Sequence, residues 1–326
     1  MPDIAVLFKP SKKVPFEFTE EHLARIAVAG GGAVKRFETE EELLESGFAA
    51  EILFTWGGSG DMPEKYCRAN GRLKWLHSFS AGMDPVMRSP IARLPIFITS
   101  SSGIHAVTIS ETVMGYILAH NRTFPFMFRM QRERVWAKGL TRDPVEAIGK
   151  TVGIVGVGAI GGQIALRARA FGMRVLGLRR HPAPAPDYDE MFSGDRLAEL
   201  LARSDYVVVS TPLTEQTRHL IGAARFGAMK KSALFINVAR GGVVDQDALI
   251  AALRAGEIAG AALDVTDPEP LPEDSPLWDM ENVIITPHMS ADAPILARLA
   301  VDFFCAAIEK YGAGERPPNL CHAPVA

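Results

Sequence analysis

The chain has 326 residues, of which 48% are apolar and 22% charged, a composition typical of a folded globular protein rather than a disordered or fibrous one. Its 35 basic and 38 acidic residues nearly balance, which excludes a broad positive field for nucleic acid or anionic membranes. Three scattered cysteines, Cys67, Cys305 and Cys321, have neither a disulfide pattern nor metal-ligand spacing, so we expect no metal and a reducing, cytoplasmic setting.

Length and hydropathy indicate how many domains the chain forms and whether it spans a membrane. A chain of this length is long for one core and suits two domains. The first apolar run, residues 4–8, lacks the basic flank and cleavage pattern of a secretory signal. No apolar run approaches the roughly twenty residues that cross a bilayer. We therefore expect a soluble, two-domain protein with no membrane partner.

The N-terminal third alternates between short apolar runs and helical segments. The runs that read as strands are residues 4–8, 52–54, 76–79 and 96–99. The helical segment "TEEELLES" has the spacing of a capping box between Thr39 and Glu42. This alternation predicts a parallel sheet covered by helices. Residues 110–136 then suit a long helix, interrupted at Pro125, that either connects the domains or packs against a second subunit.

A second alternation follows and is clearer. Six apolar, often β-branched runs predict strands over residues 152–155, 175–178, 206–209, 233–236, 261–265 and 283–286. A helix over residues 294–311 is expected to return to the first domain. The predicted fold class is α/β with two Rossmann-like domains: a flavodoxin-like substrate domain (1–101 plus 290–326) and a doubly wound parallel-sheet dinucleotide-binding domain (102–289).

The turn "GVGAIG" has the G-x-G-x-x-G spacing of a dinucleotide site. Gly156 would make the tight turn, Gly158 would let the backbone approach a pyrophosphate, and Gly161 would allow helix–strand packing. A predicted strand precedes the turn and a predicted helix follows it, so the helix N-terminus would face the anion. The alternative is a purely structural glycine-rich turn.

Three later strand ends carry side chains that suit hydride transfer to a keto acid. Arg240 follows the fourth strand and can clamp a carboxylate through two parallel hydrogen bonds. Acidic residues, among them Asp264 and Glu269, follow the fifth strand, and His288 follows the sixth. A histidine oriented by a carboxylate can donate and recover a proton near neutral pH. Taken alone, an arginine or histidine at a strand end is more often structural.

Five stretches in this order, "GVGAIG", "STPLTEQTRHLI", "NVARGGVVDQDAL", "ALDVTDPEPLP" and "NVIITPH", resemble the D-isomer-specific 2-hydroxyacid dehydrogenases. The resemblance implies that Arg240 binds and polarises a 2-keto acid, that His288 is the general acid or base, and that Glu269 supports it. It places Asp264 near the nicotinamide carboxamide. It also implies a homodimer built through the helical arm within residues 110–136.

The same resemblance suggests residues for the cofactor and the substrate. The backbone of the loop "SFSAGMD", at Ser80, Ala81 and Gly82, would hold the substrate carboxylate, although a plain strand-to-helix turn is equally compatible with the spacing. The remaining positions expected to contact the cofactor are Ala159, Ile160, Thr211, Pro212, Val238 and Ala239.

Differences from particular family members narrow the range of possible substrates. Glu269 stands where formate-oxidising relatives carry glutamine, and Ala81 stands where phosphite dehydrogenases carry lysine. Trp56 is similar to a tryptophan of the short bacterial glyoxylate and hydroxypyruvate reductases, but also suits a core or interface position. We expect reduction of a small 2-keto acid such as glyoxylate or hydroxypyruvate. The alternative is a nucleotide-sensing binding protein or corepressor on the same fold.

The segment "GLRRHP" indicates which cofactor is used. An acidic residue that holds the adenosine ribose usually ends the second strand of such a fold, and Arg179 stands there instead, followed by Arg180. An arginine attracts a 2′-phosphate and cannot accept from a ribose hydroxyl. The sequence therefore predicts NADP(H) as the preferred cofactor, with NAD(H) also possible. Two solvated arginines on a loop are the alternative.

Overall fold

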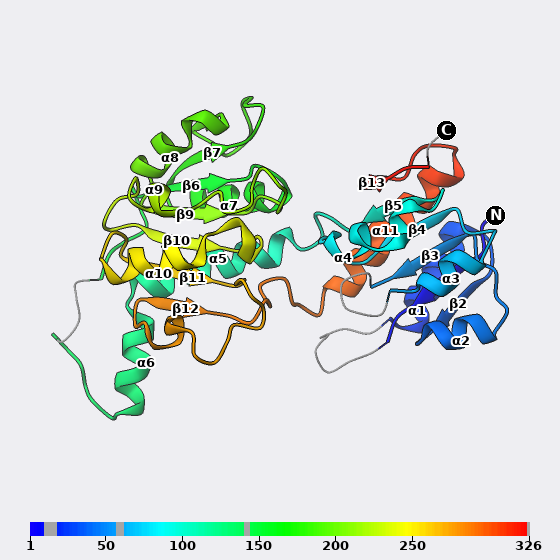
Figure 1. Cartoon of the computed structure of the whole chain (residues 1–326), viewed down its shortest axis with the longest axis horizontal. Helices are drawn as coiled ribbons and strands as arrows, with labels where there is room; N and C mark the ends of the chain where they lie inside the picture. The colour runs from blue at the N-terminus through cyan, green and yellow to red at the C-terminus, as the bar shows by residue number, and fades with distance from the viewer. Residues whose placement is uncertain (10–17, 57–61, 140–143, 325–326) are drawn as a thin grey trace. The chain divides into compact units, whose positions relative to one another are not determined.

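The computed structural model describes residues 1–9, 18–56, 62–139 and 144–324. The chain divides into two compact units, which are described separately (Figure 1). The terminal unit comprises Met1–His105 and Asp292–Ala326, and the central unit comprises Ala106–Ala291. The boundaries differ from the expected ones at both crossings: residues 102–105 belong to the terminal unit, and Ser290 and Ala291 belong to the central unit. Hydroxyls of the central unit lie 3.3 and 3.1 Å from the Ser290 and Ala291 carbonyls.

The terminal unit contains one sheet of order β13-β5-β4-β3-β1-β2. Its parallel strands are β1 (Ile4–Leu7), β2 (Val34–Phe37), β3 (Ile52–Thr55), β4 (Trp75–Ser78) and β5 (Phe97–Ser100). The edge strand β13 (Leu320–His322) runs antiparallel to β5. The parallel part has the flavodoxin-like order 2-1-3-4-5. β2 and β13 were not predicted, because "VKRF" carries two charges in four residues and "LCH" is only three residues long.

Helices cover both faces of this sheet. They are α1 (Glu20–Gly30), α2 (Glu40–Glu45), α3 (Glu64–Ala69), α4 (Asp84–Arg88) and α11 (Leu296–Gly312). Successive strand residues point to opposite faces, so Ile4 and Val6 pack with Phe304 of α11 while Ala5 and Leu7 belong to the opposite core. Thr39 caps α2 by accepting from Glu42 N at 3.1 Å, as the capping spacing predicts.

The central unit contains a seven-stranded, entirely parallel sheet of order β12-β11-β10-β9-β6-β7-β8. Its strands are β6 (Thr151–Val155), β7 (Arg174–Leu178), β8 (Glu190–Phe192), β9 (Tyr206–Val209), β10 (Leu234–Asn237), β11 (Gly260–Leu263) and β12 (Val283–Ile285). The order departs in both directions from β6, which is the doubly wound arrangement, and confirms the predicted fold class. Six strands were predicted; the seventh, β8, follows the proline-rich segment and is only three residues long.

The helices of the central unit are α5 (Ala106–Asn121), α6 (Phe124–Arg132), α7 (Ala159–Ala170), α8 (Leu197–Arg203), α9 (Ala223–Phe226) and α10 (Gln246–Arg254). The predicted long helix is therefore two helices. The break lies just before Pro125, at Thr123, whose φ of 54° is left-handed. Pro125 occupies the first turn of α6, where a missing N–H costs no hydrogen bond.

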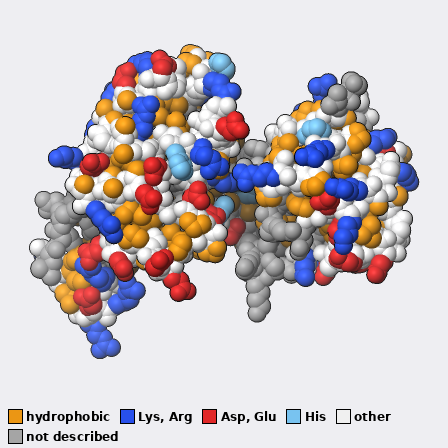
Figure 2. Space-filling view, in the orientation of Figure 1, with side chains coloured by type: hydrophobic (Ala, Val, Ile, Leu, Met, Phe, Trp, Pro, Cys, Tyr) orange, Lys and Arg blue, Asp and Glu red, His pale blue; other side chains and the backbone are white. Residues whose placement is uncertain are grey.

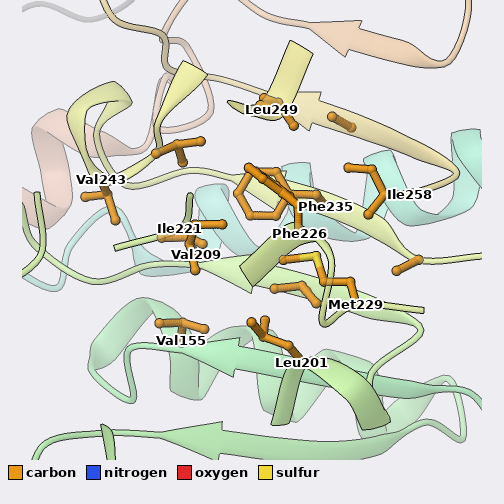
Figure 3. Packing of buried hydrophobic residues seen from close by; sticks show 14 of the residues in the cluster. Val155, Leu201, Val209, Ile221, Phe226, Met229, Phe235, Val243, Leu249 and Ile258 are labelled. Carbon is orange, nitrogen blue, oxygen red and sulfur yellow. The ribbon is translucent and has the colours of Figure 1, made fainter. Parts of the chain in front are cut away.

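Apolar side chains fill both sides of the central sheet. On one side Val155, Val209 and Phe235 project from the strands and pack among Phe226 and Leu249 (Figure 3). Alternate strand residues, such as Ile154 and Val208, face the opposite core, which includes residues of α5 and α7. Because both faces are buried, the strands are continuous apolar runs, which is why the sequence predicted most of them.

The surface carries charges of both signs. Figure 2 shows Lys and Arg side chains interspersed with Asp and Glu on the visible face of each unit, as the near-balanced composition suggests. Within the described ranges, no helix has the length and apolarity that a bilayer-spanning segment needs.

Candidate active site and cofactor-binding site

Three strand ends bring the predicted catalytic side chains to one edge of the central sheet. Arg240 follows β10, Glu269 lies in the segment after β11, and His288 lies just beyond β12. These strands are immediate neighbours, with Asn237 opposite Leu263 and Leu263 opposite Ile285. Carboxyl ends of parallel strands meet at one edge of a sheet, and this is where α/β proteins bind ligands.

The structure joins His288 to Glu269. His288 Nδ1 lies 2.9 Å from Glu269 Oε2. A carboxylate only accepts hydrogen bonds, so Nδ1 carries the proton in this pair and Nε2 is the nitrogen left to exchange a proton with another molecule. The hydrogen bond to Glu269 raises the pKa of His288, while burial and the Arg240 charge oppose the increase. The pair therefore favours a protonated, acid-competent imidazole.

The Glu269 side chain is 37% exposed and remains ionised. Burial alone would raise the pKa of Glu269, but the His288 hydrogen bond, the His288 charge and the Thr266 backbone bring it below the ordinary value. Thr266 N donates to Oε1 at 3.0 Å, so one carboxylate oxygen is held by the loop and the other faces the histidine. The loop thereby orients the carboxylate toward Nδ1.

Arg240 is brought close to this loop by the glycine that follows it. A Cβ atom at Gly241 would lie 1.8 Å from the carbonyl oxygen of Thr266, so no larger residue fits there without moving the loop. The Arg240 charge lowers the pKa of both Glu269 and His288, which indicates that the guanidinium lies within electrostatic reach of the pair. Its Nη1 donates to the Ala239 carbonyl at 2.7 Å.

Asn237 positions the Arg240 segment and was not predicted. It is 1% exposed; its Nδ2 donates to the Arg240 carbonyl at 3.1 Å, and its Oδ1 accepts from Ala239 N at 3.1 Å. A polar residue that ends an apolar strand just before an arginine is the sequence signal that could have identified it. The predicted cofactor positions Val238 and Ala239 lie in the turn between Asn237 and Arg240, which these hydrogen bonds hold, and both are buried.

Asp264 holds the turn that carries His288. Its Oδ1 accepts from the Thr286 hydroxyl at 2.6 Å and from Met289 N at 3.0 Å, and Ser290 N lies 3.1 Å from both carboxylate oxygens. Asp264 is 2% exposed. The expected contact with a nicotinamide carboxamide stays a prediction, whereas the anchoring of the His288 turn is what the structure shows.

The glycine turn has the geometry that a pyrophosphate needs. Gly156 has a φ of 116°, and a Cβ there would lie 2.8 Å from Thr211 N. A Cβ at Gly161 would lie 2.3 Å from the Gly156 carbonyl oxygen, so both positions require glycine. Gly158 has no atom within 4 Å of its Cβ position, which leaves the backbone open where α7 begins at Ala159 and Ile160. The residues present therefore fit a dinucleotide.

Two buried polar atoms lie near the end of β7, the strand beside β6 and its glycine turn. Arg179 follows β7 and donates from Nη2 to the Ala183 carbonyl at 2.8 Å. Arg179 Nε and the hydroxyl of Tyr188 are buried without a hydrogen-bond partner among the described residues. Burial raises the pKa of Tyr188 and the Arg179 charge opposes this, so the two side chains are close. Such donors suit an anionic group; Arg180, in contrast, is exposed.

Tyr188 was not predicted from the sequence as a residue of this site. Its ring covers Gly177, where a Cβ would lie 2.5 Å from Tyr188 Cδ1. The residue is separated from β7 by the proline-rich segment, so only the fold brings it back beside the glycine turn. Thr211 and Pro212, also expected at the cofactor, follow β9 next to the turn, Thr211 half-buried and Pro212 exposed.

The predicted substrate loop lies in the terminal unit. Ser80 N donates to the Ser78 hydroxyl at 3.1 Å, and the Ser80 hydroxyl donates to the Trp56 carbonyl at 2.8 Å. The Trp56 ring stacks on Phe79, with centroids 4.7 Å apart and planes 22° apart. Ala81 is exposed and Gly82 half-buried, so their N–H groups are the better placed to bind a ligand. The rest of "TWGGSG", residues 57–60, lies outside the described residues.

No metal-binding cluster is present among the residues that the structure describes. No group of three or more His, Cys, Asp or Glu side chains there is arranged to hold a metal ion.

Comparisons with known proteins identify the family. Residues 114–290 match the family described as D-isomer specific 2-hydroxyacid dehydrogenase, NAD binding domain. D-3-phosphoglycerate dehydrogenase from Methanocaldococcus jannaschii is 33% identical over 88% of this chain and 54% of its own length, so the chain spans about half of that relative. Glyoxylate/hydroxypyruvate reductase B from Escherichia fergusonii is 33% identical over 93% of this chain and 94% of its own length.

A solved structure of the same family is similar to this chain over almost its whole length. The D-isomer specific 2-hydroxyacid dehydrogenase from Xanthobacter autotrophicus Py2, in complex with NADPH and MES, is 31% identical. The similarity covers 98% of this chain and 97% of that chain, with a TM-score of 0.80. The chain belongs to the D-isomer-specific 2-hydroxyacid dehydrogenases, NAD(P)-dependent oxidoreductases that act on the CH–OH group of hydroxy acids.

Proposed function

We propose that this protein is an NADP(H)-preferring reductase of small 2-keto acids such as glyoxylate or hydroxypyruvate. The observation that carries the proposal is the His288–Glu269 pair, with Nδ1 and Oε2 2.9 Å apart, beside Arg240 at the carboxyl edge of a dinucleotide-binding sheet. When bound, a nicotinamide would supply a hydride from its C4 to C2 of the keto acid. His288 Nε2 would give the keto oxygen its proton, so that the 2-hydroxy acid is formed.

The roles of the other side chains follow from their charge. Arg240 binds the substrate carboxylate and polarises the keto group, because a guanidinium forms paired hydrogen bonds with such oxygens. Glu269 keeps His288 protonated and oriented until the proton is transferred. In oxidation the roles reverse, and neutral His288 accepts the hydroxyl proton. Trp56, Ser80, Ala81 and Gly82 are the proposed substrate-binding residues of the terminal unit.

The preference for NADP(H) rests on Arg179. A positive side chain replaces the ribose-binding acid at the end of β7, and its Nε is buried without a partner among the described residues. We expect Arg179→Asp to lower the affinity for NADPH by about tenfold or more, since a charged hydrogen bond contributes about 1.5–3 kcal/mol. The affinity for NADH should rise or stay the same. Equal losses for both cofactors in a fluorescence titration would contradict the assignment.

The reductase activity is tested by the loss of NADPH absorbance with glyoxylate and with hydroxypyruvate. We expect turnover with at least one of them, and His288→Ala should abolish it while the NADPH dissociation constant changes little. Tight NADPH binding without turnover over a panel of 2-keto acids would instead favour a nucleotide-sensing binding protein or corepressor.

A homodimer through α6 is part of the proposal. No described residue of α6 is buried, and Phe128 is 58% exposed. Trp136, just beyond the helix, is 90% exposed. The exposed Phe124 ring lies 5.7 Å from that of Phe128, and neighbouring exposed aromatic rings favour an interaction surface. We expect a dimer by size-exclusion chromatography with light scattering and a monomer for Phe128→Glu/Trp136→Glu; a monomeric wild-type protein would refute the dimer.

A further inference from the structure

Three hydroxyl groups on α5 reach the turn that carries His288. Thr108, Thr112 and Tyr116 are spaced four residues apart, so they lie on one face of the helix. Thr108 Oγ1 donates to the Ala291 carbonyl at 3.1 Å. Thr112 Oγ1 lies 3.3 Å from the Ser290 carbonyl and 3.2 Å from the Thr108 carbonyl of its own helix, so its one proton is shared between them. The hydroxyl of Tyr116 contacts that of Thr286. One face of α5 therefore binds the turn on both sides of His288.

The direction of the hydrogen bonds between Tyr116 and Asp264 follows from chemistry. The Asp264 carboxylate only accepts, so the Thr286 hydroxyl donates to Oδ1 across 2.6 Å. The Thr286 proton is then committed, and its oxygen must accept from the phenol of Tyr116. Burial raises the pKa of Tyr116, so the phenol keeps its proton throughout the range in which His288 titrates. The chain runs from Tyr116 through Thr286 to Asp264.

Asp264 transmits this support to His288. The His288 backbone N–H donates to the Asp264 carbonyl at 2.8 Å, and the Asp264 carboxylate binds the next two backbone N–H groups. His288 has a φ of 52°, a left-handed conformation that is costly for a residue with a Cβ. Such a conformation persists only where surrounding contacts determine it. The contacts here are those that α5 and Asp264 supply.

We propose that Tyr116 is a positioning residue which, through Thr286 and Asp264, fixes the His288 turn so that the imidazole meets Glu269. The proposal rests on the acid–base role proposed for His288. The charged groups that act on His288 are Glu269, Asp264 and Arg240. Of these, Glu269 raises the pKa most strongly and does so through the hydrogen bond, which depends on where the turn holds the ring.

The test compares Tyr116→Phe with a matched control, Tyr206→Phe. The Tyr206 hydroxyl is also buried and contacts α5, through Asn121 at 2.7 and 3.0 Å, but no described contact joins it to the His288 turn. Either substitution deletes one buried phenol hydroxyl. We expect similar losses of thermal stability, whereas Tyr116→Phe alone should lower kcat by about three- to tenfold, the worth of one hydrogen bond.

Two further readouts separate positioning from simple destabilisation. The pKa of His288, measured by NMR titration and assigned with His288→Gln, should fall in Tyr116→Phe and stay unchanged in Tyr206→Phe. The KM for NADPH should not change in either variant. If both variants show the same kcat and the same His288 pKa as wild type, Tyr116 is only structural and the proposal is overturned.

A second pair of variants keeps the test decisive if Tyr116→Phe does not fold. Thr286→Ser retains the hydroxyl and should keep the wild-type His288 pKa, whereas Thr286→Val removes it and should lower that pKa. Equal values in the two variants would also overturn the proposal. A wild-type protein without turnover would refute the proposed function instead, and the NMR titration would still decide whether Tyr116 positions His288.

Discussion

Replacement of Glu269 by glutamine tests the acid–base pair most directly. Glutamine has the same shape but carries no charge and has only one carbonyl oxygen, which can accept from His288 Nδ1 or from Thr266 N while its NH₂ group faces the other donor. The charge-assisted hydrogen bond that raises the pKa of His288 is then weakened, while burial and the Arg240 charge, which lower it, remain. The pKa of His288 should therefore fall.

The size of the effect follows from the proton equilibrium. Each unit of pKa corresponds to about 1.4 kcal/mol, so a fall of about one unit removes roughly nine-tenths of the protonated histidine at any pH well above the wild-type pKa. For 2-keto acid reduction, the basic limb of the kcat/KM profile should move to lower pH by about one unit. For oxidation, which needs neutral His288, the acidic limb should move in the same direction.

The assay is a pH–rate profile in both directions for wild type, Glu269→Gln and the control Glu273→Gln. Glu273 is exposed and lies in the same segment, so its replacement removes an equal charge nearby without touching His288. NADPH affinity should be equal in all three proteins. An unshifted limb in Glu269→Gln, or an equal shift in the control, would refute the reasoning that the hydrogen-bonded carboxylate sets the histidine pKa.

Two other predictions concern stability and packing. The raised pKa of His288 stabilises the fold at pH below the unfolded value of about 6.5, and this contribution disappears as pH rises through the folded value. The lowered pKa of Glu269 stabilises above an unfolded value of about 4.3, and its contribution is lost as pH falls through the folded value. The wild-type advantage in Tm over Glu269→Gln should therefore peak between these limits and vanish outside them; a pH-independent difference would contradict this. Gly241→Ala, whose Cβ would lie 1.8 Å from the Thr266 carbonyl oxygen, should lower kcat by displacing the Glu269 loop, with NADPH affinity unchanged. Gly115→Ala on α5, where the added carbon meets nothing within 4 Å, should not lower kcat; if both variants behave alike, the steric argument fails.

Local patterns predicted the strand ends and the glycine turn well. Gly156 and Arg240 each follow a strand that is almost entirely buried, and His288 follows the partly buried apolar strand β12, so the apolar run itself marks the edge where each residue lies. The class of fold followed from the same alternation. The edge strands β2, β8 and β13 escaped prediction because they are short and each contains a polar or charged residue, whereas the equally short edge strand β12 is entirely apolar and was predicted.

The supports of the site could not be predicted from the sequence. Tyr116 and Thr286 are 170 positions apart, and nothing in the pattern of α5 distinguishes a hydroxyl that faces the His288 turn from one that packs in the core. Tyr188 returns to the glycine turn across a proline-rich loop. Side-chain hydrogen bonds between distant segments depend on the packed geometry, whereas strand ends depend on a local repeat.

The two roles of Asp264 can be separated by experiment. A carboxylate has about four lone-pair positions, and here Oδ1 already accepts from Thr286, Met289 and Ser290 while Oδ2 accepts from Ser290 alone. A contact with the nicotinamide carboxamide, which the family resemblance implies, must therefore use Oδ2. Asp264→Asn places an NH₂ group against donors of the turn, and its effect depends on which role dominates.

If Asp264 mainly anchors the turn, Asp264→Asn should lower kcat and the His288 pKa together and leave the NADPH dissociation constant within about twofold. If it mainly binds the nicotinamide, the dissociation constant should rise by about tenfold while the His288 pKa stays at the wild-type value. We expect the first result, because three groups of the His288 turn already bind this carboxylate. Weaker NADPH binding together with an unchanged His288 pKa would show that anchoring of the turn is the lesser role of Asp264.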